Sequence, residues 1–148
     1  NNVDENLGDA TLVSNNEIQK ETPSTENTVE KEEDSYFKES KLSRDTMYSQ
    51  TLETYKSMLN NNNVSEEQKA IITQEITKLN KEKNAIMICE NLISTKGFEN
   101  CVIFVNVESV SVIIKSDELK AEEIAQIQNI ISREIGAKVE NIHIMKRK

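Results

Sequence analysis

The fold of this chain is decided by residues 101–114, which read CVIFVNVESVSVII. Two runs rich in β-branched residues flank residues 106–109, which read NVES, and this pattern predicts a β-hairpin with a four-residue loop. The loop sets the register of the two strands. Six apolar side chains then share one face, which we expect to be the core side: Val105 opposite Val110, Ile103 opposite Val112 and Cys101 opposite Ile114.

The opposite face of the hairpin carries Val102 opposite Ile113 and Phe104 opposite Ser111. It is largely apolar, whereas a sheet covered on one side is normally polar on the other. Two interpretations stay open. Either the N-terminal segments partly cover this face or it docks a partner, because contiguous exposed apolar residues usually mark contacts. We hypothesise that the four residues, with an unpaired edge strand beside them, form part of a protein interface by packing or strand addition.

Two helices are predicted before the hairpin. The first begins at Tyr36 and should end at residues 60–63, because asparagine side chains compete for the backbone hydrogen bonds of a helix. The second runs from a capping box at Ser65 and Gln68 to Lys96 and Gly97, a typical helix end. Apolar residues recur at helical spacing in both: Tyr48, Leu52, Tyr55 and Leu59 in the first, and Ile72, Ile76, Leu79, Ile86 and Ile93 in the second, where Lys83 and Glu90 interrupt the stripe.

Two further elements are predicted after the hairpin. Residues 121–135 return to helical spacing and stop at Gly136, with isoleucines at 124, 127, 131 and 135. The last segment, Val139–Met145, alternates Ile142 and Ile144 with polar residues, as a half-buried strand does.

These elements predict an α+β fold. Two N-terminal helices lead into an α-β-β-α-β module, in which a three-stranded sheet carries two helices on one face. We divide the chain into an acidic tail (residues 1–34), a helical stalk (residues 35–81, broken near 60–64) and an α/β module (residues 82–148).

The acidic tail holds the net charge of the chain. It contains ten acidic residues and two lysines, few large apolar residues and no periodicity, so we expect it to be disordered. Residues 35–148 carry sixteen acidic and sixteen basic residues and offer no basic field to phosphates. The outline of the module is also that of an RNA-binding KH domain, but the chain has no G-x-x-G loop. We therefore expect no nucleic-acid partner.

Residues able to support catalysis are few. The one histidine, His143, is predicted on the outward side of the last strand, as a surface residue. Cys89 and Cys101 are twelve positions apart, which fits no metal or redox motif, so we interpret them as buried thiols or as a disulfide pair. We expect no catalytic residue, no metal and no cofactor.

A family likeness enters with residues 90–115, which read ENLISTKGFENCVIFVNVESVSVIIK, followed by the isoleucine-striped helix and VENIHIM at 139–145. This sequence resembles the soluble region of the stage III sporulation protein AH family, from about Tyr36 to the C-terminus. The resemblance implies that the module is a ring-building (YscJ/FliF-like) module. Ring-building modules of other secretion and flagellar basal-body proteins share the element order, so a component of such an apparatus is the alternative.

The resemblance also implies a function. Members of the family are non-catalytic assembly proteins of endospore formation, anchored in the mother-cell (outer forespore) membrane by one N-terminal span, which we expect before Asn1. Their soluble domain lies in the space between mother cell and forespore and binds stage II sporulation protein Q. The pair, with other stage III sporulation channel proteins, forms part of a ring or channel needed for engulfment. On this basis the acidic tail is a juxtamembrane spacer.

Overall fold

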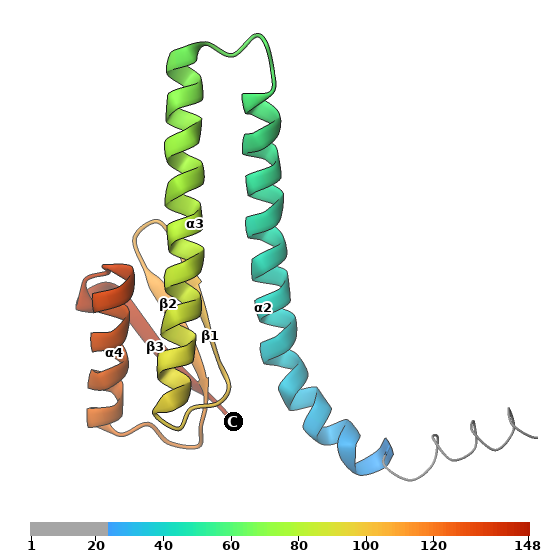
Figure 1. The fold of residues 1–148 in the computed structure, drawn as a ribbon. Helices are drawn as coiled ribbons and strands as arrows, with labels where there is room; N and C mark the ends of the chain where they lie inside the picture. Colours follow the sequence, from blue (N-terminus) through green and yellow to red (C-terminus); the bar gives the residue numbers. More distant parts are fainter. Residues whose placement is uncertain (1–23) are drawn as a thin grey trace, which may run out of the picture. The chain divides into compact units, whose positions relative to one another are not determined.

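The computed structural model describes the backbone of residues 24–148 and the side chains from Ser35 onward. The chain divides into two compact units, Asn1–Tyr36 and Phe37–Lys148. The elements follow in the order α2 (Ser24–Leu59), α3 (Glu66–Thr95), β1 (Cys101–Val105), β2 (Val110–Lys115), α4 (Ala121–Ile135), the short 3-10 helix η1 (Val139–Asn141) and β3 (Ile142–Arg147), as Figure 1 shows. Most of the predicted acidic tail lies outside the described residues, so its disorder stays a prediction.

The sheet has three strands in the order β1-β2-β3. Strands β1 and β2 are antiparallel, and their register is the predicted one, from Val105 opposite Val110 to Cys101 opposite Ile114. Strands β2 and β3 are parallel, which requires a crossover connection, and α4 supplies it. Helices α3 and α4 cover the same face of the sheet, so the predicted α+β module is confirmed (Figure 1).

The core lies between that face of the sheet and the two helices. Its buried members are the alternate side chains of the strands together with the apolar stripes of α3 and α4, chiefly Ile103, Val112 and Ile114 with Ile86, Ile93, Ile127 and Ile131. Tyr48 of α2 also belongs to this cluster. The core side assigned to the hairpin from its register is therefore confirmed, with Val105 as a half-buried member at its margin.

The ends of α3 and α4 follow the signals in the sequence. The Ser65 side chain accepts a hydrogen bond from the backbone of Gln68, and the Gln68 side chain accepts one from the backbone of Ser65, which completes the capping box. At the other end Gly97 takes a φ of 102°, and Gly136 after α4 takes a φ of 86°. Both angles lie in the left-handed region that glycine adopts without steric cost.

Two boundaries differ from those predicted. Helix α2 begins at Ser24 rather than Tyr36, because residues 24–34 lack the large apolar residues that would reveal a helical period. The last strand begins at Ile142 rather than Val139, and residues 139–141 form a 3-10 turn in which the Asn141 backbone N–H donates to the Lys138 carbonyl. This turn redirects the chain from α4 to a position beside β2. The strand then continues to Arg147. The alternation of apolar residues did not indicate this end, because the side chain of Arg147 is polar.

Candidate protein-binding surface

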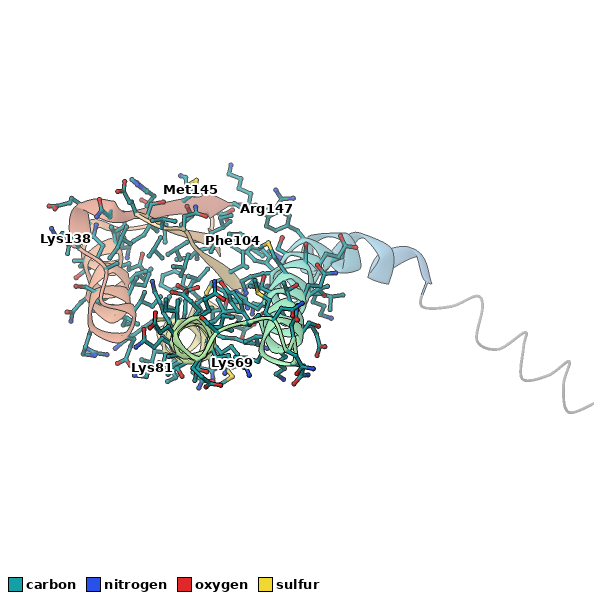
Figure 2. The ribbon with its side chains drawn as sticks, turned by 90° about the horizontal axis from the view of Figure 1, so that it is seen from above. Lys69, Lys81, Phe104, Lys138, Met145 and Arg147 are labelled. Carbon is teal, nitrogen blue, oxygen red and sulfur yellow. The ribbon has the colours of Figure 1, made fainter. Side chains whose placement is uncertain are left out.

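The face of the sheet turned away from α3 and α4 is called the outer face below. The strand register arranges its side chains in three rows across the sheet. The rows are Phe104, Ser111 and His143; then Val102, Ile113 and Met145; then Lys115 and Arg147. Figure 2 shows Met145 and Arg147 at β3, on the side of the sheet opposite to the labelled residues of α3.

The predicted interface residues are not equally accessible on the outer face. Val102 is fully buried, with 0% of the residue exposed, so other parts of the chain cover it and it offers no surface to a partner. Phe104, Ser111 and Ile113 are half-buried. Met145, next to Ile113 in the same row, is 47% exposed and was not among the predicted residues. The sequence could have placed Met145 on this face, because it follows His143 by two positions and side chains two positions apart in a strand share a face.

Two basic residues lie at one end of the outer face, where Lys115 and Arg147 are register partners. Both already have interaction partners within the chain. A partner that presents apolar groups to the first two rows would match this face.

The apolar surface continues from Phe104 onto α2. A crevice of about 220 Å³ lies between α2 and the end of β1, and its wall includes Met47, Thr51 and Phe104. The Met47 side chain is 60% exposed. Sequence reasoning missed Met47, because nothing local shows which side of α2 faces the strand.

The edge of the sheet at β1 is closed by side chains. The Ile103 backbone N–H donates to Glu90 Oε2 at 3.1 Å, and the Ile103 carbonyl accepts from Arg44 Nη1 at 2.9 Å. Arg44 Nη1 also donates to Glu90 Oε2 at 2.7 Å, and the two side chains are only 7% and 10% exposed. We call this group the edge clamp. The expected unpaired edge is thus occupied at Ile103, whereas β3 has no strand on its far side among the described residues.

The clamp keeps Arg44 charged. Burial acts to lower the pKa of its guanidinium, but the hydrogen bonds and charges of Glu90 and then Asp45 together outweigh burial, and the net shift is upward. Close by, the Tyr48 hydroxyl donates to Glu82 Oε2 at 2.7 Å. Burial first, and then the hydrogen bond to Glu82, raise the pKa of Tyr48 well above its ordinary value. Two polar contacts therefore tie α2 to α3.

The predicted thiol pair consists of two buried, free cysteines. The Cys89 Sγ lies 3.9 Å from the Ile130 carbonyl oxygen, a weak hydrogen bond to α4. Burial raises the pKa of both the Cys89 and the Cys101 thiols to about 12. Thiols in this state are poor nucleophiles, because the thiolate is the reactive form.

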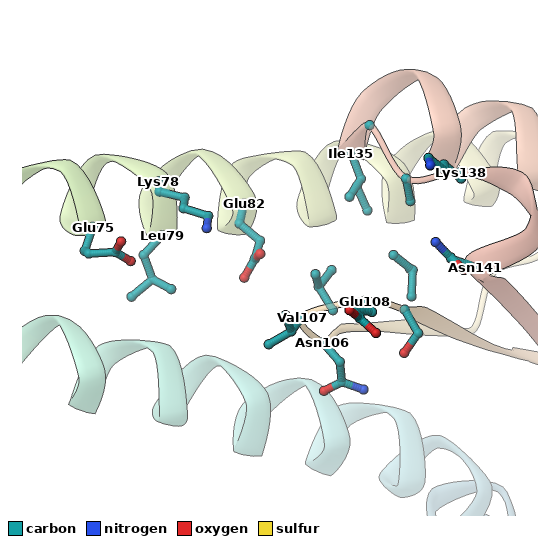
Figure 3. A pocket seen from close by; sticks show the side chains of 15 residues that line it. Glu75, Lys78, Leu79, Glu82, Asn106, Val107, Glu108, Ile135, Lys138 and Asn141 are labelled. Atoms are coloured by element: carbon teal, nitrogen blue, oxygen red, sulfur yellow. The ribbon is translucent and has the colours of Figure 1, made fainter.

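A second hollow lies beside α3, on the side of the hairpin loop (Figure 3). Its volume is about 630 Å³, and it opens to solvent between α3, residues 106–109 and the segment after α4. Glu75, Lys78 and Glu82 line it along α3, while Glu108 and Lys138 come from the hairpin loop and from the segment after α4. The lining has no histidine or cysteine, and Glu82 is already bonded to Tyr48.

Metal sites and membrane spans were examined as well. Within the part of the chain that the structure describes, no three His, Cys, Asp or Glu residues gather as metal ligands would. Among helices α2, α3 and α4, as far as they are described, none is long and apolar enough to cross a bilayer.

The fold is similar to that of a chain in a solved complex. A chain from the structure of the SpoIIQ-SpoIIIAH pore forming complex superposes with a TM-score of 0.68 at 16% identity, covering 76% of this chain and 96% of that one. The type III secretion system protein EscJ of enteropathogenic E. coli has a TM-score of 0.43 at 22% identity, covering 49% of this chain and 50% of EscJ.

The comparison of sequences gives the family. None of the curated proteins compared with the chain matches it. The family model described as SpoIIIAH-like protein matches residues 1–144, which is nearly the whole sequence. The chain therefore belongs to the SpoIIIAH-like protein family.

Proposed function

We propose that this protein is a non-catalytic assembly protein of endospore formation, and that its partner is a stage II sporulation protein Q (SpoIIQ). The observation that carries the proposal is the outer face, where Phe104, Ile113 and Met145 form an apolar surface on the fold shared with a chain of the SpoIIQ-SpoIIIAH pore forming complex. A surface of this kind usually marks a protein contact.

The chemistry of the outer face suits docking of another protein. Phe104 and Ile113 are half-buried, so they are held in place before binding and lose little side-chain entropy when a partner covers them. Met145 and Met47 are flexible and polarizable, which lets the margin of the surface adapt to a partner.

The family to which the chain belongs supports a setting for the protein. We place the described domain in the space between mother cell and forespore, anchored in the mother-cell (outer forespore) membrane by a span outside this chain. There it would join SpoIIQ and other stage III sporulation channel proteins in a ring or channel that engulfment and forespore development require. The charge of residues 1–34 suits a spacer near the membrane.

The test is a charge placed at the centre of the surface. The Phe104→Glu variant should bind the soluble domain of SpoIIQ at least about tenfold more weakly, because truncation of a central aromatic contact typically costs more than 1 kcal/mol and a buried carboxylate adds to this. Isothermal titration calorimetry measures the affinity, and circular dichroism checks the fold.

The matched control is Met87→Glu, an equal change of charge on an exposed residue of α3, on the other side of the sheet. It should bind SpoIIQ like the wild type. Equal affinity of Phe104→Glu and the wild type would exclude the outer face as the SpoIIQ site. A wild-type chain that does not bind SpoIIQ at all would overturn the proposed function.

A further inference from the structure

The sulfur atoms of this chain are divided between exposed thioethers and buried thiols. The sequence contains four methionines, and all of them are between 44% and 60% exposed: Met47, Met58, Met87 and Met145. The two cysteines, by contrast, lie in the core. Susceptibility to oxidation follows exposure, so an oxidant in solution meets the methionines first.

The cysteines are protected in a second way. Peroxides oxidise the thiolate rather than the thiol. Burial raises the pKa of Cys89 and Cys101 to about 12, so both stay protonated near neutral pH. A thioether has no proton to lose, and its oxidation does not depend on a pKa. The methionines are therefore the sulfur atoms that respond to a peroxide while the chain is folded.

Two of the four methionines border the proposed SpoIIQ surface. Met145 lies on the outer face, in the row next to that of Phe104 (Figure 2), and Met47 lines the crevice beside Phe104. The other two lie elsewhere: Met87 is on α3, on the other side of the sheet, and Met58 is the last residue but one of α2. The two pairs are similarly exposed, but only the first borders the surface.

Oxidation of a thioether changes such a surface locally. Hydrogen peroxide transfers one oxygen atom to the sulfur: an S–O bond forms, the O–O bond breaks, and the peroxide leaves as water. The sulfur loses two electrons, and the peroxide gains them. The sulfoxide that results is polar and chiral, where the thioether was flexible and apolar. Because Met145 and Met47 are about half exposed, water solvates the new oxygen in the free chain and the fold is retained.

The effect of the sulfoxides falls on the complex instead. A partner that covers the first two rows of the outer face with apolar groups removes the water around the sulfoxide oxygen. Burial of a polar group without a compensating hydrogen bond is unfavourable, and in proteins its cost corresponds to a loss of affinity of about fivefold or more.

We propose that Met145 and Met47 are sulfoxidation sites, and that their oxidation by a peroxide releases SpoIIQ from the outer face. Methionine sulfoxide reductases would restore the surface, since they remove the oxygen as water with two electrons from a dithiol, which becomes a disulfide. The proposal rests on the proposed function, because SpoIIQ must bind the outer face for this oxidation to affect it.

The first experiment compares affinities before and after oxidation of this chain alone. The full chain is treated with hydrogen peroxide, freed of the oxidant and titrated with untreated SpoIIQ soluble domain by isothermal titration calorimetry. The Kd should rise at least about fivefold. Treatment with the reductases and dithiothreitol should reverse the rise. Peptide mass mapping gives the oxygen added at each methionine and cysteine.

Two double variants locate the effect, each compared with its own untreated form. Met47→Leu with Met145→Leu should keep its Kd after peroxide, because leucine has a similar volume and no sulfur. Met58→Leu with Met87→Leu retains the two methionines of the surface, and its Kd should rise as that of the wild type does.

The second experiment remains decisive if the oxidised chain does not fold. A short pulse of peroxide is applied to the wild-type chain alone and to its complex with SpoIIQ, and peptide mapping follows each site. Bound SpoIIQ should slow the oxidation of Met145 and Met47 several-fold, because it covers them. Met87 and Met58 should be oxidised at the rate of the free chain.

The outcomes separate this proposal from the proposed function. A folded chain that carries both sulfoxides and binds SpoIIQ as before would overturn the sulfoxidation sites alone. So would an equal loss of affinity in the variant without Met47 and Met145, or oxidation of these two methionines at the free rate in the complex. An untreated chain that does not bind SpoIIQ would overturn both proposals.

Discussion

At the scale of single residues, Glu90 has the most consequential environment. Its position in α3 interrupts an apolar stripe, and one carboxylate oxygen, Oε2, accepts from both Arg44 and the backbone of Ile103. The buried Glu90 carboxylate of α3 thus binds both α2 and β1. Glu90, although it is polar, therefore joins α3 to α2 and β1 and does not weaken the packing of α3.

Removal of Glu90 should be strongly destabilising. Glu90→Ala leaves the Ile103 N–H without its partner and leaves the buried Arg44 cation with Asp45 as its remaining carboxylate, 3.1 Å away. The cost should therefore lie near the lower end of the roughly 3–5 kcal/mol that breaking a buried pair costs. Urea denaturation followed by circular dichroism measures the free energy of unfolding. Glu66→Ala, which removes an exposed partner of Lys69, should change it by less than about 1 kcal/mol. Equal effects of the two changes would contradict the role given to the clamp.

The two thiols give a second prediction at this scale. Their pKa values are about 12 in the folded chain, against an ordinary value of 9.0, so the thiolate fraction is about a thousandfold lower than in the unfolded chain. Iodoacetamide at pH 8 should therefore alkylate Cys89 and Cys101 only after denaturation, as read by intact mass. Rapid alkylation of the native chain would contradict their burial.

The same shift sets a dependence of stability on pH. Since the folded pKa is raised, the unfolded chain loses its thiol protons first, from about pH 9, while the folded chain keeps them to about pH 12. The contribution of the thiols to stability is complete below pH 9 and falls as the pH rises through that window. Replacement of both cysteines by alanine should flatten this part of the profile in denaturation experiments.

At the scale of elements, the α2–α3 hairpin depends on a defined turn. Helix α2 ends at Leu59, and α3 starts after the Ser65 cap, whose Oγ accepts from the Gln68 backbone N–H at 3.2 Å. The intervening asparagines include Asn61, whose side chain accepts from the Asn63 backbone at 3.0 Å. Such local bonds compete with helix formation and separate the two helices.

The cap can be tested without touching the sheet. Ser65→Ala should lower the free energy of unfolding by about 1 kcal/mol, because the first turn of α3 loses a partner for a backbone N–H. Ser65→Asp keeps an acceptor at the same position and should retain the wild-type stability. Thermal melting of the three proteins gives the comparison, and an unaltered melting temperature for Ser65→Ala would show that this end of α3 does not contribute.

At the scale of the whole molecule, charge and core are separated along the chain. Every buried residue of the core cluster belongs to the unit Phe37–Lys148, and residues 35–148 carry equal numbers of acidic and basic residues. The net charge of −8 therefore resides in residues 1–34. Neutral surfaces give little long-range repulsion between copies, which suits a domain that assembles with others.

Deletion of residues 1–34 is the matching prediction. The shortened chain should melt cooperatively near the wild-type temperature, because it keeps the whole core, while its isoelectric point rises from the value of about 4.8 toward neutrality. Calorimetry and isoelectric focusing measure the two properties. Loss of the cooperative transition would mean that the acidic segment contributes to the fold.

Much of the fold could be predicted because its signals are local. The four-residue loop fixed the register of β1 and β2, the isoleucine spacing defined α4, and Gly97 and Gly136 marked helix ends. The start of β3 was harder, since Val139 is β-branched and lies just before the alternation of Ile142 and Ile144, although its backbone forms a 3-10 turn. A β-branched residue beside an alternating run does not show whether the strand has already begun.

The sequence by itself determined the elements, the hairpin register and the core side, because period and loop length are encoded between near neighbours. Only the tertiary structure decided that Val102 is buried, that Met47 borders Phe104, and that Arg44 closes the edge of β1. These contacts join residues far apart in the chain. They depend on how α2 is rotated and placed beside the sheet, and helical periodicity does not specify the partner of a polar position.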